Sequence, residues 1–256
     1  MGTGMFQAAD GYDRLIGRFL PSLAPAFADF AGVEKGSALD VGCGPGGLTV
    51  ELARRLGAGS VSAIDPSSPF VAACRERVPG AEVIEGVAEA LPFADGAFDS
   101  ALSSLVVGFM SDAQRGVREM ARVTRAGGVV ALCFWDHARM QGIARFWRAA
   151  GRVLGISPAD DRLLGLREGE LASLLEGAGL VDVRATEIVA TADYRDIDDL
   201  WSGYTARIGP IGQFVQTLTA DQLDAVRIAV REDLDDPDGP FTLDAVAWAA
   251  RAAVPA

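Results

Sequence analysis

Short apolar runs alternate with amphipathic stretches over the first half of the chain, a pattern typical of α/β proteins. Between the first two runs, Leu48, Leu52 and Leu56 recur at helical spacing and mark the buried face of a helix. Further helices are expected at 70–78 and 113–125, so strands and helices alternate and predict a parallel sheet covered by helices. The apolar runs themselves predict buried strands at residues 38–41, 60–64, 81–86, 98–107 and 129–135.

The second half of the chain continues this pattern but carries two insertions. Residues 170–180 predict a helix that ends at glycine and precedes a sixth strand. Residues 241–249 predict a last strand, although their alanines also permit a helix. The segments 136–167 and 194–240 carry aromatic residues at helical spacing, and we interpret them as a cap on a single domain spanning 1–256. Core packing or a dimer face is the alternative for such aromatic stripes.

Charge and composition narrow the possible partners. Half of the residues are apolar, and 23 basic residues face 35 acidic ones, which gives a net charge of −12. Nucleic acid and anionic membranes are therefore not expected as partners, because both need clustered cations. No apolar run reaches the about 18 residues of a spanning helix, and no secretion signal is present. Cys43, Cys74 and Cys133 lack metal-like spacing and His137 is the single histidine, so we expect a reduced cytoplasmic protein without a zinc site.

The residues that indicate chemistry lie in one stretch, 38–55, which has the pattern of a strand, a glycine-rich turn and an amphipathic helix. Glycine lets the backbone turn sharply and approach a ligand, because no Cβ stands in the way. The helix that follows points its free N–H groups at the same ligand. The pattern predicts a nucleotide-type cofactor site built on four glycines, Gly42, Gly44, Gly46 and Gly47.

Two classes of cofactor fit such a loop. Gly42, Gly44 and Gly47 satisfy the dinucleotide pattern G-x-G-x-x-G, so a nicotinamide or flavin cofactor has to be considered. Asp40, which precedes the first glycine at the strand tip, argues against it, since its carboxylate would repel a pyrophosphate. The same carboxylate would attract a cationic ligand, such as one that carries an ammonium and a sulfonium group.

The string from Asp40 to Gly46, Asp-Val-Gly-Cys-Gly-Pro-Gly, resembles motif I of the class I S-adenosylmethionine-dependent methyltransferases. The resemblance extends to Trp135 and resumes over 168–189. Within the family, the chain is similar to the small-molecule methyltransferases of ubiquinone and menaquinone biosynthesis. The resemblance implies an α/β fold with a doubly wound, mostly parallel, seven-stranded Rossmann-like sheet. The last strand would be antiparallel, and a helical cap would cover the substrate.

The resemblance also implies where the cofactor S-adenosyl-L-methionine binds. In the family, the acid and the glycines of motif I hold the methionine part of the cofactor. Asp65 ends the second predicted strand, and its carboxylate can accept two hydrogen bonds from a ribose diol. Capping of the next helix, alone or together with Ser67, is the structural alternative for Asp65. The expected cofactor-binding residues are Tyr12, Arg14, Asp40, Gly42, Cys43, Gly44, Gly46, Asp65, Pro66, Ala88, Glu89, Ser104 and Leu105.

Two later segments contribute to this set. By resemblance, Ala88 supplies a backbone N–H to the adenine ring, and Glu89 lies beside the adenine amino group. Ser104 and Leu105 end the fourth predicted strand, so they should meet the cofactor at the carboxyl edge of the sheet. Gly108 stands where relatives often carry a histidine, which removes one polar group from the mouth of the site.

The N-terminal segment 1–32 is interpreted as a helical lid. Its apolar residues recur at helical spacing, and Pro21 and Pro25 are expected to split it into two helices. Tyr12 and Arg14 belong to a segment that precedes motif I in relatives, where such residues lie near the cofactor carboxylate. A helix that merely packs on the domain is the alternative.

The expected reaction is methyl transfer to a small apolar or aromatic metabolite at O, N or C. Such an in-line displacement needs alignment and exclusion of water, and it needs a base only if the acceptor begins protonated. His137 follows the fifth predicted strand and is the candidate base, with a structural role as the alternative. A cofactor-binding partner protein without transfer activity, or a nicotinamide oxidoreductase, would share the glycine loop. We expect a monomer or a homodimer.

Overall fold

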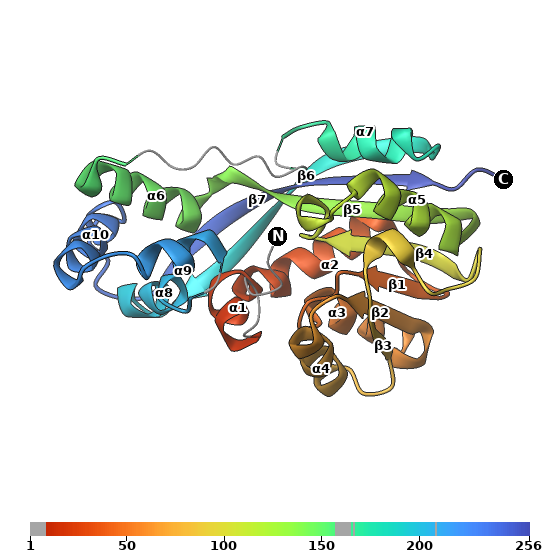
Figure 1. The fold of residues 1–256 in the computed structure, drawn as a ribbon, viewed down its shortest axis with the longest axis horizontal. Helices are drawn as coiled ribbons and strands as arrows, with labels where there is room; N and C mark the ends of the chain where they lie inside the picture. The colour runs from red at the N-terminus through yellow and green to blue at the C-terminus, as the bar shows by residue number, and fades with distance from the viewer. Residues whose placement is uncertain (1–8, 157–164, 166, 208) are drawn as a thin grey trace.

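The computed structural model describes residues 9–156, 165, 167–207 and 209–256. Its seven strands form one sheet in the order β3-β2-β1-β4-β5-β7-β6 (Figure 1). The first five strands pair in parallel, and β7 runs antiparallel to both β5 and β6. The expected sheet with an antiparallel last strand is therefore confirmed. The strands are β1 (Ala38–Val41), β2 (Val61–Asp65), β3 (Glu82–Glu85), β4 (Phe98–Ser104), β5 (Thr124–Met140), β6 (Val181–Tyr194) and β7 (Phe241–Ala253).

Helices cover both faces of this sheet. α2 and α3 bury their apolar stripes on one face, and α5 and α7 bury theirs on the other (Figure 1). One end of the sheet carries the helices α6, α8, α9 and α10, which are named the cap helices after the cap that the sequence predicts (Figure 1). The helices are α1 (Ala9–Leu15), α2 (Leu20–Ala31), α3 (Gly47–Leu56), α4 (Ser68–Arg77), α5 (Ala113–Val123), α6 (Gln141–Leu154), α7 (Glu170–Gly177), α8 (Ile197–Tyr204), α9 (Gly209–Val215) and α10 (Ala220–Glu232).

Several predicted strand bounds were wrong. β5 was expected over 129–135 but runs from Thr124 to Met140, and β7 pairs with it over Val129–Trp135 and again at Met140. The last strand was expected to stop at 249 but runs to Ala253. β4 was expected to reach Val107 but ends at Ser104. Leu105 adopts a left-handed φ of 64°, which turns the chain out of the sheet before the short 3-10 helix η4 (Val107–Phe109).

The N-terminal segment breaks earlier than its prolines suggested. The interruption lies between α1 and α2, in the 3-10 helix η1 (Gly17–Phe19). Pro21 sits in the first turn of α2, where its missing N–H is not needed. Pro25 lies inside α2 and does not end it, so the predicted split at Pro25 was wrong. Residues 1–8 of the expected lid, and 157–164 and 166 of the first insertion, lie outside the described residues.

The aromatic stripes of the two insertions pack against one another. Phe146 of α6 and Tyr204 of α8 are fully buried with ring centroids 4.9 Å apart, and the Tyr204 hydroxyl donates to the carbonyl of Gly142 at 2.8 Å. Phe214 of α9 joins them edge-on to Phe146. These stripes therefore fill the interior of the cap, as the core-packing alternative predicted.

Candidate functional site

Two buried carboxylates lie at the carboxyl ends of the adjacent parallel strands β1 and β2. Asp65 accepts one backbone hydrogen bond from Gly44 at 2.9 Å and another from Ser67 at 2.8 Å. The carboxylate thus ties the glycine loop to the start of α4. Ser67 occupies the N-cap position, but its side chain makes no capping bond. Burial raises the pKa of Asp65 above its ordinary value, although both backbone hydrogen bonds act in the opposite direction.

Asp40 is the most deeply placed acid of the site. Its Oδ2 accepts a hydrogen bond from the Thr49 hydroxyl at 2.7 Å, while no group of the described residues donates to its buried Oδ1. Burial raises the pKa of Asp40 to about 7, even though the Thr49 hydrogen bond lowers it. A buried carboxylate oxygen without a partner fits a cationic group such as an ammonium.

The glycines of the loop serve different purposes. All of Gly42, Gly44 and Gly46 have positive φ angles, at 77°, 53° and 101°. A Cβ added at Gly42 would lie 2.4 Å from the Val106 side chain, and one at Gly46 would lie 3.0 Å from Cys74 Sγ. At Gly44 it would meet nothing within 4 Å. Protein side chains therefore occupy the space beside Gly42 and Gly46, and of these three glycines Gly44 has open space beside it.

Cys43 contacts both the glycine loop and α4. Its thiol donates to the Gly44 carbonyl at 3.4 Å, and the neighbouring Cys74 thiol of α4, together with burial, raises the pKa of Cys43. The backbone N–H groups of Gly42 and Cys43 both donate to the carbonyl of Ile64, at 2.7 and 3.0 Å. These two N–H groups are therefore used within the protein, as is the N–H of Gly44, which donates to Asp65.

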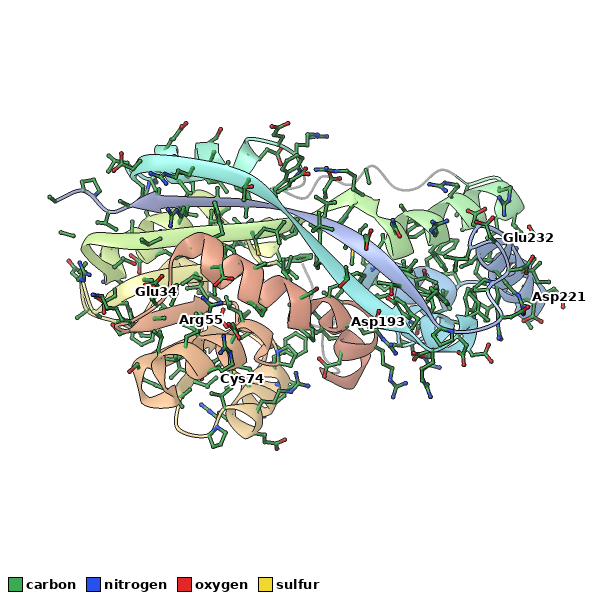
Figure 2. The ribbon with its side chains drawn as sticks, turned by 180° about the vertical axis from the view of Figure 1, so that it is seen from behind. Glu34, Arg55, Cys74, Asp193, Asp221 and Glu232 are labelled. Carbon is green, nitrogen blue, oxygen red and sulfur yellow. The ribbon has the colours of Figure 1, made fainter. Side chains whose placement is uncertain are left out.

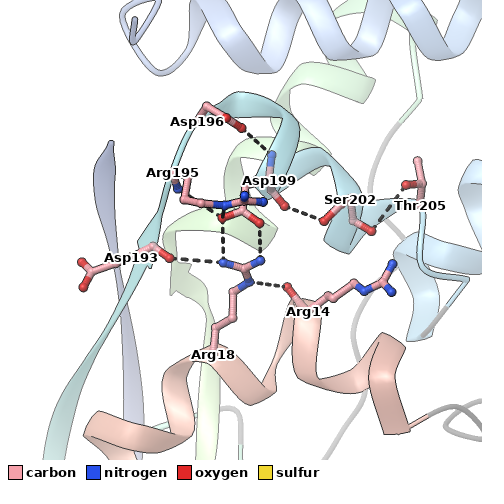
Figure 3. A network of polar contacts seen from close by, with 8 residues as sticks. All are labelled: Arg14, Arg18, Asp193, Arg195, Asp196, Asp199, Ser202 and Thr205. Atoms are coloured by element: carbon pink, nitrogen blue, oxygen red, sulfur yellow. Dashed lines mark hydrogen bonds and ion pairs between the residues drawn. The ribbon is translucent and has the colours of Figure 1, made fainter. Parts of the chain in front are cut away.

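Of the two lid residues expected near the cofactor, the structure brings Tyr12 to the site. The half-buried Tyr12 ring packs edge-on against Phe70 of α4, with centroids 5.8 Å apart. Burial, followed by the nearby carboxylates of Asp13 and Asp65, raises the pKa of Tyr12 above its ordinary value. Arg14 is exposed, and Figure 3 shows its side chain extending away from Asp199.

The adenine-side residues lie in the loop after β3. Ala88 is buried and begins the 3-10 helix η3 (Ala88–Ala90). The Oε1 of Glu89 accepts hydrogen bonds from the backbone and hydroxyl of Ser111, at 2.7 and 2.8 Å, and from the backbone of Asp112 at 3.1 Å. Burial raises the pKa of Glu89, but these hydrogen bonds outweigh it and lower the pKa below the ordinary value. Glu89 therefore fastens the turn that precedes α5.

The ends of β4 and β2 complete the edge. The Ser104 hydroxyl lies 3.3 Å from Cys133 Sγ, and the Leu105 N–H donates to the Cys133 carbonyl at 2.8 Å. Both residues lie at the carboxyl end of β4, as expected. Pro66 is exposed directly after Asp65.

The candidate base lies within a strand and not in a loop. His137 is half-buried in the extended part of β5, where the pairing with β7 is irregular. Its ring centroid lies 6.2 Å from that of Phe134, which in turn lies 5.7 Å from Phe109. Phe109 is 44% exposed, whereas Phe134 is 1% exposed, so of these two rings Phe109 is the one that reaches the surface.

Sequence reasoning missed two contributors to this site. Thr49 lies in the first turn of α3, and its spacing from Asp40 could have indicated the hydrogen bond. Val106 carries no sequence signal, because the glycine that it packs on comes from a distant segment. A cavity of about 510 Å³ lies elsewhere, between α7, β6 and β7. Among the described residues, no cluster of metal-ligating side chains occurs, and no helix there is long and apolar enough to span a bilayer.

Comparison with known proteins decides the family. A family model described as a methyltransferase domain matches residues 39–132. The demethylmenaquinone methyltransferase of Roseiflexus castenholzii is 35% identical over 197 residues, which cover 68% of this chain and 82% of that protein. The chain belongs to the class I S-adenosylmethionine-dependent methyltransferase family. Other members that it matches include the malonyl-acyl-carrier-protein O-methyltransferase of Enterobacter lignolyticus, 34% identical over 52% of this chain and 55% of that protein.

The sequence matches cover only part of most relatives, whereas the structural matches cover almost the whole chain. The chain spans about half the length of most of the curated relatives it matches. The geranyl diphosphate C-methyltransferase of Streptomyces coelicolor aligns over 93% of this chain and 81% of its own, with a TM-score of 0.53 and 15% identity. The cyclase SpnF aligns over 91% of this chain and 81% of its own, with a TM-score of 0.54 and 20% identity. At such identities the likeness establishes the fold alone.

Proposed function

We propose that this protein transfers a methyl group from S-adenosylmethionine to a small apolar or aromatic metabolite. The observation that carries the proposal is the buried Asp40 Oδ1, which has no partner among the described residues and lies at the same sheet edge as the Asp65 carboxylate and the open space at Gly44. When bound, S-adenosylmethionine supplies a methyl group activated by a positively charged sulfur. Asp40 would then hold the cationic methionine part, and Asp65 would accept the ribose hydroxyls.

The remaining residues of the site orient the reactants and exclude water. Tyr12 would close the site from the α1 side, because its phenol already lies close to the carboxylates of the edge. Phe109, which is 44% exposed and packs on the buried ring of Phe134, would offer apolar surface for an acceptor ring. His137 lies beside this surface and would take a proton from an acceptor that begins protonated. The name of the Roseiflexus relative, demethylmenaquinone methyltransferase, supports an acceptor with a ring.

The proposal also assigns roles to three segments of the chain outside the cofactor site. Residues 1–32 would act as the lid, and the segments 136–167 and 194–240 would form the substrate cap on one domain. The cap helices follow β5 and β6, two strands whose carboxyl ends lead to the same edge as the carboxylates.

The cofactor is tested by calorimetric titration with S-adenosylmethionine, S-adenosylhomocysteine and NAD. We expect the first two to bind and NAD not to bind. Asp65→Ala should weaken the binding of both by about tenfold or more, since a charge-assisted hydrogen bond is lost. Glu82→Ala is the matched control, because Glu82 is an exposed acid at the opposite end of the neighbouring strand β3. Binding of NAD alone would refute the proposal.

Transfer itself is tested by product formation. Methylated product should appear when the protein is incubated with S-adenosylmethionine and a panel of hydroquinones, phenols and aliphatic acids. Tight cofactor binding with no product from any acceptor would favour a binding protein without transfer activity. His137→Gln should lower the rate of methyl transfer to acceptors that begin protonated, and it should shift the pH profile of that rate. The affinity for the cofactor should stay unchanged.

A further inference from the structure

Arg18 of η1 joins the N-terminal segment to the end of β6 and the start of α8, where its partners lie 175 and 181 residues later in the chain. Its Nε donates to the Arg14 carbonyl at 3.0 Å, and its Nη1 donates to the Asp193 carbonyl at 3.2 Å. Nη1 also donates to Asp199 Oδ2 at 3.0 Å, and Nη2 forms an ion pair with Oδ1 of the same carboxylate. The guanidinium lies 5.0 Å from the centroid of the Tyr194 ring. Figure 3 shows this network between the N-terminal segment, the end of β6 and α8.

The α8 partner of this network is built into the cap. Asp199 is almost completely buried, and the hydrogen bonds from Arg18 lower its pKa to about 2. Asp196 caps α8 by accepting from the Asp199 backbone at 2.8 Å, which fixes the first turn of the helix (Figure 3). Gly203 lets α8 approach α1 closely, because a Cβ there would lie 2.8 Å from the Arg14 carbonyl oxygen.

The opposite side of α1 is attached more weakly. Asp13 forms an ion pair with Arg77 of α4, and both side chains are 35% exposed. The Tyr12 ring packs on Phe70 of the same helix. Exposed ion pairs contribute little to stability, whereas a buried carboxylate that loses its partner is strongly destabilised. α1 is therefore fixed to the cap through Arg18 and only lightly attached to the helix beside the cofactor site.

We propose that Arg18 and Asp199 are positioning residues that hold α1 so that Tyr12 closes the cofactor site. The ion pair thereby makes closure of the lid depend on the position of the cap helix α8, which belongs to the predicted acceptor cap. This inference rests on the proposed function. Arg18 and Asp199 act through Tyr12 and do not touch the cofactor.

The test compares two adjacent acids in the first turn of α8. Asp199→Asn removes the charge that faces Arg18, whereas Asp198→Asn removes the charge that pairs with Arg227 of α10, away from the lid. S-adenosylhomocysteine is titrated into each protein, and hydrogen exchange of residues 9–19 is followed with and without it. We expect Asp199→Asn to raise the Kd by about tenfold, mainly through faster dissociation, and Asp198→Asn to stay within about twofold.

The hydrogen-exchange signal separates positioning from simple loss of stability. In the parent, ligand should protect residues 9–19, and Asp199→Asn should lose this protection while the protection of β1 and β2 persists. Arg18→Lys keeps the charge but cannot donate to the Arg14 and Asp193 carbonyls together, so its Kd should lie between those of the parent and Asp199→Asn. It also serves as the test if Asp199→Asn does not fold.

Failure of the proposed function and failure of the positioning role give different results. If the parent does not bind S-adenosylhomocysteine, the proposed function fails. If the parent binds but Asp199→Asn and Arg18→Lys lower only the melting temperature, with unchanged Kd and unchanged ligand protection of residues 9–19, the positioning role is overturned.

Discussion

At the scale of single residues, Asp40 makes the stability of the protein depend on pH. Its pKa is about 7 in the folded state and 3.8 in a solvated chain, so the folded state binds this proton more tightly. The stability that results is fully present below about pH 4 and is lost as the pH rises through 7. The parent should therefore lose stability between pH 5 and pH 8 that Asp40→Asn keeps. The free energy of unfolding of the variant, relative to the parent, should be higher at pH 8 than at pH 5 by ~1–3 kcal/mol.

Denaturant unfolding at both pH values measures this difference. Asp95→Asn is the control, because Asp95 is a largely exposed acid whose loss should shift stability by a similar, small amount at both pH values. A difference between Asp40→Asn and the parent that is the same at pH 5 and pH 8 would show that the Asp40 carboxyl is not the titrating group.

At the scale of elements, Arg55 of α3 holds α2 on the sheet. It pairs with Asp29 of α2 at 2.7 Å and with Glu51 of its own helix at 2.6 Å, and it donates to the Pro25 carbonyl at 3.0 Å. Figure 2 shows Arg55 beside α2. Arg55→Met should lower the free energy of unfolding by about 2 kcal/mol, because the part-buried Pro25 carbonyl loses its donor and the buried Glu51 carboxylate loses one of its two arginine partners.

The neighbouring Arg54 provides the control for Arg55. Its side chain is 67% exposed, compared with 13% for Arg55, and it pairs with Glu51 alone. Arg54→Met should change the denaturant midpoint little. Equal losses in the two variants would mean that Glu51, and not the attachment of α2 to α3, accounts for the effect.

At the scale of the whole molecule, the cap and the sheet share one hydrophobic core. A single buried cluster contains Phe27 of α2, Leu102 of β4 and Phe146 of α6. We therefore expect calorimetry to show one unfolding transition with equal calorimetric and van't Hoff enthalpies. Phe146→Ala should shift this whole transition down by ~6–15 °C, because removing a buried ring from a core costs ~3–5 kcal/mol.

Ile228→Ala on α10 is the control for the cap, since Ile228 is 60% exposed and should leave the transition nearly unchanged. A separate low-temperature transition in Phe146→Ala, with the main one unmoved, would show that the cap unfolds independently of the sheet.

Local patterns in the sequence are enough to predict most of the elements and the edge of the sheet where the candidate site lies. The strand, glycine turn and helix around Asp40 are encoded within a few residues, because turn chemistry and hydrophobic periodicity are local properties. Asp65 could be placed at the same edge, since successive parallel strands deliver their carboxyl ends together. The antiparallel last strand followed from resemblance, and its alanines alone did not distinguish it from a helix.

Only the tertiary structure decided what surrounds these residues. Val106 fills the space at Gly42, β7 lengthens β5, and burial raises the pKa of Asp40. Arg18 meets Asp199 across 181 positions of the chain. Local patterns specify which segments are strands and helices, but partners and burial depend on how distant segments pack, which no short stretch of sequence contains.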